Sequence, residues 1–66
     1  MNFYIRDLVN SNGKTQYRVS KDTGIPQASM SDYMQGKTKP TLKNIIKLSE
    51  YFDVSIEEFV RGCADD

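Results

Sequence analysis

The stretch TGIPQASMSDYMQGKTKP, residues 23–40, carries the clearest pattern in this chain of 66 residues. Pro26 suits the start of a helix and Gly36 suits its end, so the spacing predicts a helix from about residue 26 to residue 34 or 35. Met30 and Tyr33 form its apolar stripe. A helix that only packs against a core does not need the polar residues that share it. The segment therefore indicates a recognition surface made of Gln27, Ser29, Ser31 and Asp32.

A second helix is predicted immediately before this one. Thr15 is a suitable N-cap and Gly24 a suitable end, with Val19 facing inward. Ser20 is small and lies four residues before Gly24, as two helices that cross steeply through a short turn require. Residues 15–35 therefore match a helix-turn-helix pattern. The angle between its helices would be filled by Val19, Thr23, Ile25, Met30 and Tyr33.

Three further helices are predicted around this unit. One has an apolar face and stops at Asn12-Gly13, one opens at Pro40 and Thr41, and the last begins with a capping box at residues 55–58. The first has Ile5, Leu8 and Val9 on one face, the second has Leu42, Ile45, Ile46, Leu48, Ser49 and Phe52 at helical spacing, and the last has Ile56, Phe59 and Val60 inward. We find no strand alternation and no linker. The sequence predicts a compact all-α domain of five short helices over residues 1–66.

The composition argues against catalytic and metal chemistry. Histidine is absent, which removes the commonest general base and a common metal ligand. Cys63 is the single cysteine, so neither an internal disulfide nor a zinc site is expected. A chain this short has a thin core and no room for a deep cleft. We expect no enzymatic activity, no cofactor, no metal and no small-molecule ligand.

Residues 1–11 carry both charge signs and are not a signal peptide, and no apolar run in the chain approaches membrane length. We therefore expect a cytoplasmic protein without a membrane partner.

The charges are unevenly distributed although the net charge is zero. Residues 14–43 hold six Lys or Arg and two Asp or Glu, a local charge of +4, whereas residues 44–66 hold two and six, a local charge of −4. A polyanion would be attracted to the first region and repelled by the second. Two ordinary solvated faces would give the same pattern, so the asymmetry alone does not choose between these interpretations.

The segment TQYRVSKDTGIPQASMSDYMQGKTKPTLKNIIKLSEYFDVSIEEFV, residues 15–60, resembles the lambda-repressor-like, or XRE-type, helix-turn-helix domain of phage repressors, Cro proteins and many small bacterial regulators. The resemblance covers about residues 3 to 60. Its matching pieces are Thr15-Gln16, Ser20 with Gly24, Gly36-Lys37 with Pro40, and LSEYFDVSIEEFV at residues 48–60. The sequence departs from the pattern at Lys14, Thr23 and Ala28.

The resemblance implies a DNA-binding transcriptional regulator, phage or bacterial and most often a repressor, that binds a palindromic operator as a homodimer. Its third helix would enter the major groove of double-stranded DNA. Gln27 suits an adenine, Ala28 a thymine methyl, and Ser29 a phosphate or a base. Asp32 suits a cytosine amino group, although a solvated or lysine-paired carboxylate explains it equally well.

The remaining contacts implied by the resemblance surround this helix. Gln16 matches a glutamine that holds the DNA backbone, beside the free N–H groups of a helix end. Lys37 and Lys39 follow the Gly36 turn and are the main phosphate candidates, with Thr15, Gln35, Thr38 and Lys43 as lesser ones. The dimer contact is expected to join the fifth helix with the end of the fourth, through Phe59 and Val60 and their neighbours.

A second function stays open. The chain would also suit an antitoxin or anti-repressor, whose main partner is a protein and whose DNA binding is secondary. An exposed apolar patch on the fifth helix would support it, with contributions from Phe3, Tyr4, Tyr51 and Cys63.

Overall fold

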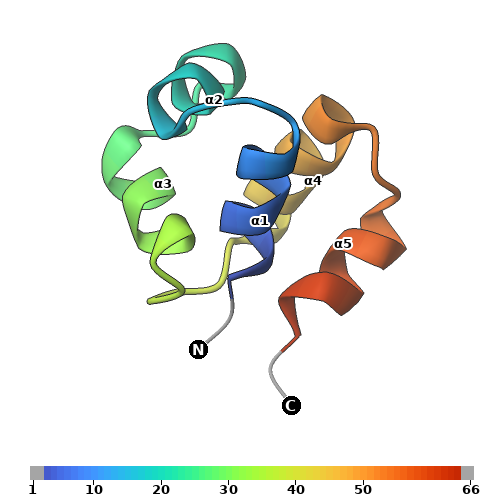
Figure 1. Cartoon of the computed structure of the whole chain (residues 1–66). Coiled ribbons are helices and arrows are strands. Elements are labelled where there is room, and N and C mark those ends of the chain that lie inside the picture. Colours follow the sequence, from blue (N-terminus) through green and yellow to red (C-terminus); the bar gives the residue numbers. More distant parts are fainter. Residues whose placement is uncertain (1–2, 65–66) are drawn as a thin grey trace.

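The computed structural model describes residues 3–64 and contains five α-helices and no strand within that range (Figure 1). None of these helices is both long and apolar enough to cross a membrane. The helices are α1 (Tyr4–Ser11), α2 (Gln16–Thr23), α3 (Gln27–Met34), α4 (Leu42–Phe52) and α5 (Ile56–Cys63). The predicted all-α architecture is confirmed, and the helix boundaries agree with the sequence to within a residue or two.

The ends of the helices follow the predicted capping residues. The side chains of Thr15, Thr41 and Ser55 each accept a hydrogen bond from a backbone N–H in the first turn of α2, α4 and α5. Gly24 ends α2 in the left-handed conformation, with φ of 81°, and its N–H donates to Ser20 O. A side chain would strain this backbone, so glycine is required at the turn.

The core lies where α1 packs between α3 and α5, with α2 and α4 closing the other sides (Figure 1). Its buried apolar residues come from all five helices and from the turn between α2 and α3; they are Ile5, Val9, Val19, Ile25, Met30, Tyr33, Leu48, Phe59 and Cys63. Figure 1 shows α3 and α5 on opposite sides of α1. The helix-turn-helix unit and α5 therefore present separate surfaces.

Several apolar residues that fit the predicted helical stripes are exposed. Ile56 and Val60 are each 45% exposed, and Leu42 and Ile46 are 66% and 37% exposed. Short helices at the edge of a small domain bury a narrow stripe, which in α5 consists of Phe59 and Cys63 at i and i+4 spacing. The inward predictions for Ile56 and Val60 are wrong, and so is the use of Phe59 as a dimer contact, because Phe59 is fully buried in the monomer.

The contact between α1 and α5 depends on Gly62. The rings of Tyr4 and Phe59 form an edge-to-face pair with centroids 5.3 Å apart. A Cβ atom at residue 62 would collide with the Tyr4 ring. The absent side chain thus lets α1 and α5 approach closely.

Candidate nucleic-acid interface

The turn between α2 and α3 is fixed by side-chain hydrogen bonds as well as by Gly24. Ser20 Oγ donates to the carbonyl of Ile25 inside the core. Thr23 Oγ1 donates to Val19 O at 2.7 Å and accepts from the N–H of Ile25 at 3.3 Å. The polar residue at position 23, a departure from the usual pattern, therefore bonds the end of α2 to the turn. These bonds set the angle between the two helices.

Gln16 joins the start of α2 to the start of α3. Its Nε2 donates to the backbone carbonyl of Gln27 at 3.3 Å. Beside it, Thr15 Oγ1 accepts from the N–H of Arg18 at 3.1 Å, which leaves the hydroxyl hydrogen of Thr15 available to another acceptor. Three residues singled out from the sequence, Thr15, Gln16 and Gln27, therefore lie together where α2 and α3 begin.

The open face of α3 is polar and its other face is buried. Gln27, Ala28 and Gln35 are exposed, Ser29 and Asp32 are half-buried, and Met30 and Tyr33 lie in the core as predicted. Gln35 Nε2 donates to Ser31 Oγ at 2.9 Å. Ser31 stands at i+4 from Gln27 and at i−4 from Gln35, on the same helical row. That spacing places Ser31 on the open face, in keeping with the recognition surface expected from the sequence.

Asn44, a residue that the sequence reasoning did not include in the site, supports α3 from α4. Asn44 Nδ2 donates to the hydroxyl of Tyr33 at 2.8 Å. Tyr33 is buried below the open face of α3, whereas Asn44 lies in the first turn of α4. The bond fixes the spacing of these helices on either side of the loop that carries Lys37 and Lys39. Its only sequence signal is a polar residue beside an apolar stripe, which is too common to be informative.

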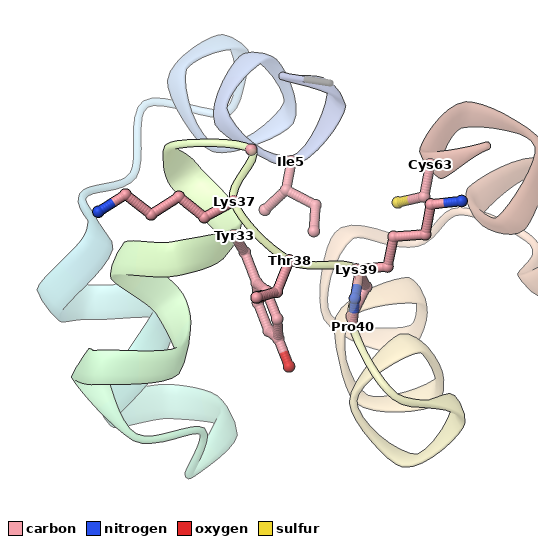
Figure 2. A pocket seen from close by; sticks show the side chains of 8 residues that line it. Ile5, Tyr33, Lys37, Thr38, Lys39, Pro40 and Cys63 are labelled. Atoms are coloured by element: carbon pink, nitrogen blue, oxygen red, sulfur yellow. The ribbon is translucent and has the colours of Figure 1, made fainter. Parts of the chain in front are cut away.

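The two principal lysines extend in different directions. Figure 2 shows Lys37 extending away from Cys63, on the side of α3, whereas Lys39 extends toward Cys63 on α5. Both line a small pocket of about 70 Å³ behind the loop, together with Tyr33 and Cys63. Lys39 also lines a groove between the start of α4 and the end of α5. Of this pair, Lys37 is the one that extends on the side of α3, and Thr38 and Lys43 are exposed nearby in sequence.

A polar cluster connects α2 to the last turn of α4. Asp22 Oδ2 accepts from the Tyr51 hydroxyl at 2.6 Å and from Arg18 Nε at 3.0 Å, and Lys14 Nζ lies 5.7 Å from the centre of the Tyr51 ring. The Tyr51 hydrogen bond and the Arg18 charge lower the pKa of Asp22 from its ordinary value, and the same hydrogen bond raises the pKa of Tyr51. The cluster holds the C-terminal end of α2, the end away from Gln16, on α4.

Within residues 3–64, no three or more Cys, Asp or Glu side chains are grouped as metal ligands would be. Beside the Asp32 carboxylate, the surface around α3 presents amides, hydroxyls and lysines. Such groups donate to phosphates and to base edges.

The sequence comparisons agree with this description. A profile described as helix-turn-helix matches residues 5–59, most of the chain. The chain therefore belongs to the lambda-repressor-like helix-turn-helix family of DNA-binding transcriptional regulators. This confirms the resemblance drawn from the sequence.

A curated relative is the "Cryptic phage CTXphi transcriptional repressor RstR" of Vibrio cholerae serotype O1 (strain ATCC 39315 / El Tor Inaba N16961). It is 32% identical over 53 residues, a match that covers 80% of this chain and 47% of the relative. The chain thus spans about half the length of that repressor. No solved structure matches the chain significantly.

Proposed function

We propose that this protein is a transcriptional repressor that binds a palindromic operator in double-stranded DNA through α3. The observation that carries the proposal is the hydrogen bond from Gln16 to the Gln27 carbonyl, beside an exposed Gln27 side chain. It sets the N-terminal ends of α2 and α3 side by side, so that one can hold a phosphate while the other reaches base edges. The family membership and the repressor relative support this assignment.

In this proposal the first turn of α3 reads bases. Gln27 makes no side-chain hydrogen bond with any residue from 3 to 64, so both ends of its amide are available to the N6 and N7 positions of an adenine. Ala28 is exposed and suits the methyl group of a thymine. Ser29 and Asp32 are the further candidates for base contacts.

Phosphate contacts are proposed on both sides of this helix. Thr15 and Gln16 supply a hydroxyl and an amide at the start of α2, and Gln35 supplies an amide at the end of α3. Lys37, Thr38, Lys39 and Lys43 continue the set through the loop into α4. Of these, Lys37 has the best support, because its side chain extends on the side of α3 and forms no ion pair within residues 3–64.

A homodimer on DNA is proposed through α4 and α5. Four of the five large exposed apolar side chains among the described residues lie on these two helices: Leu42, Ile46, Ile56 and Val60. A groove of about 220 Å³ between the helices is lined by Val60 together with Pro40, Ile45 and Cys63. Two-fold pairing through this surface would leave both copies of α3 uncovered, spaced about 34 Å apart along one duplex turn.

Selection of bound duplexes from a random pool tests the proposal directly. We expect one enriched sequence with dyad symmetry and half-site centres one helical turn apart. An enriched sequence without symmetry, bound by one protomer, would contradict the proposed dimer but would still support sequence-specific DNA binding. Recovery of the starting pool unchanged would contradict sequence-specific binding.

The exposed apolar residues on α5 also favour a second candidate, a protein-interaction module of the antitoxin or anti-repressor type. Val60 and Ile56 support it, whereas Tyr4 and Cys63 do not, because they are half-buried and buried against the core. Failure of the protein to bind any duplex on a DNA column would favour this alternative.

A further inference from the structure

The carboxylate of Asp32 has no partner among residues 3–64. It forms no side-chain hydrogen bond or ion pair there, although it is half-buried on α3. Its backbone is held in place, because the carbonyl of Asp32 accepts from the N–H of Lys37 at 2.9 Å. The Lys37 side chain nevertheless forms no ion pair with the carboxylate. Of the explanations left open by the sequence, lysine pairing is therefore excluded for the described structure.

The position of this charge is unusual for a surface that binds a polyanion. Asp32 is the one acidic residue between positions 23 and 49, a segment that holds four lysines. It stands four residues after Ala28, one turn along the same side of α3, and so belongs to the base-reading face of the proposed function. A negative charge at this place repels phosphates on every duplex.

We propose that Asp32 is a specificity-determining residue that selects a cytosine in each operator half-site and weakens binding to all other sequences. The inference rests on the proposed function, and it adds one base of the operator and a mechanism for rejecting other DNA. A carboxylate accepts hydrogen bonds but cannot donate them. Only a base edge with a donor can compensate its repulsion from the phosphates.

The major groove offers two such donors. Cytosine presents its N4 amino group, and adenine presents its N6 amino group directly beside the N7 acceptor. The lone pair of N7 repels a carboxylate that approaches N6, whereas the cytosine edge has no acceptor of its own in the groove. Guanine and the thymine edge present acceptors and no donor. The chemistry of Asp32 therefore favours cytosine over the other three bases.

Two substitutions at Asp32 test this inference by duplex selection and by affinity measurement. Asp32→Ala should abolish the preference at one position per half-site, which amounts to a loss of about 5- to 150-fold in discrimination, the range of one good base contact. Asp32→Asn should change the preferred base from cytosine to adenine. The amide oxygen can accept from N6 of adenine while the amide nitrogen donates to N7. Both variants should bind duplexes without an operator more tightly than the wild type does.

Glu50→Gln is the matched control, because it removes the same charge from an exposed position on α4. It should leave the selected sequence unchanged. If the wild type selects a site and both Asp32 variants select the same site, the inference is wrong while the proposed function stands. If base preference is unchanged but the slope of log affinity against log salt steepens by about 0.9, Asp32 acts by neutralising a lysine, which also overturns the inference. If the wild type selects no site, the proposed function fails and the inference fails with it.

Discussion

The hydroxyl of Tyr51 in α4 donates a 2.6 Å hydrogen bond to the carboxylate of Asp22 in α2, across 29 positions of sequence. Together with the bond from Asn44 to the Tyr33 hydroxyl, it adds a polar link between the helix-turn-helix unit and α4 to the packing of the apolar core. The carboxylate also accepts from Arg18 on its own helix. The strength of the attachment should therefore depend on the charge of Asp22.

Tyr51→Phe should lower the free energy of unfolding at neutral pH, by a small amount that depends on pH. The pKa of Asp22 is lowered from 3.8 in the folded state, so the stabilisation is present above pH 3.8 and is lost as the pH falls below the folded value. The pKa of Tyr51 is raised from 10.0, so its contribution is present below pH 10.0 and is lost as the pH rises through the folded value. Denaturant titrations of wild type and variant at several pH values should converge at both extremes.

Tyr17→Phe is the matched control, because Tyr17 is 58% exposed on α2 and no hydroxyl partner is described for it. It should leave the stability unchanged at every pH. A constant difference between Tyr51→Phe and wild type, from acid to alkaline pH, would show that the ring and not the hydrogen bond accounts for the effect.

Gln27→Ala should remove base discrimination without affecting the fold. The side chain is exposed and forms no hydrogen bond with the described residues, so the thermal midpoint should stay almost unchanged. Affinity for the best operator should fall by about 1–3 kcal/mol, the range of a bidentate base contact, with the loss confined to one base position per half-site. Binding to unrelated duplexes should barely change, because the amide contacts no phosphate in this role.

Ser20→Leu provides the contrast to Gln27→Ala. Ser20 is buried where α2 and α3 cross and its hydroxyl bonds the Ile25 carbonyl, so a larger apolar side chain should cost about 1–3 kcal/mol of stability. All DNA binding should decline with it. If Gln27→Ala weakens every duplex equally, or melts the domain as Ser20→Leu should, then Gln27 is a structural residue.

Lys37→Ala should weaken binding to operator and non-operator duplexes by similar factors. The loss of one phosphate contact flattens the slope of log affinity against log salt by roughly 0.9. Lys39→Ala is the informative comparison, since Lys39 extends toward α5 and should change the slope less. The sequence alone ranked these lysines together. Equal effects of the two substitutions would show that the loop rearranges on DNA.

Val60→Glu should separate DNA binding from dimer formation. Val60 is 45% exposed, so the fold should be retained, while a carboxylate among the apolar residues of the groove should prevent a second copy from packing there. The number of protomers on an operator duplex, measured by sedimentation, should fall from two to one. Val60→Ile keeps the apolar character and should keep two. If two protomers of Val60→Glu still bind the operator, the dimer contact lies elsewhere.

The helix-turn-helix unit was predictable because its signals are local. Thr15, Gly24 and Pro26 act through the backbone of their own neighbours, and a cap or a left-handed turn needs no knowledge of the rest of the chain. The buried face of α5 was less predictable. Apolar residues at positions 56, 59 and 60 all fit a helical stripe, but only Phe59 faces inward, because the width of the stripe depends on how α1 packs against it.

In the predicted site, too, the features that depend on local signals were predictable and those that depend on distant contacts were not. Gln16 and Gln27 come together because the turn between their helices is short, and the sequence shows that turn. The divergence of Lys37 and Lys39 depends on the path of a loop, for which the sequence holds no comparable signal. Asn44 was missed because its partner, the Tyr33 hydroxyl, lies 11 positions away on another helix.

The close approach of Gly62 to Tyr4 has a consequence for saturation libraries of this chain. Any side chain at position 62 must displace a ring that already packs against the buried Phe59, so every substitution there should be depleted, whichever operator is used for selection. At position 27 the surviving residues should instead follow the operator supplied, because that side chain is exposed and forms no hydrogen bond with residues 3–64. Comparing libraries selected on different operators would thus separate positions that serve folding from positions that serve recognition, without a stability measurement on any single variant.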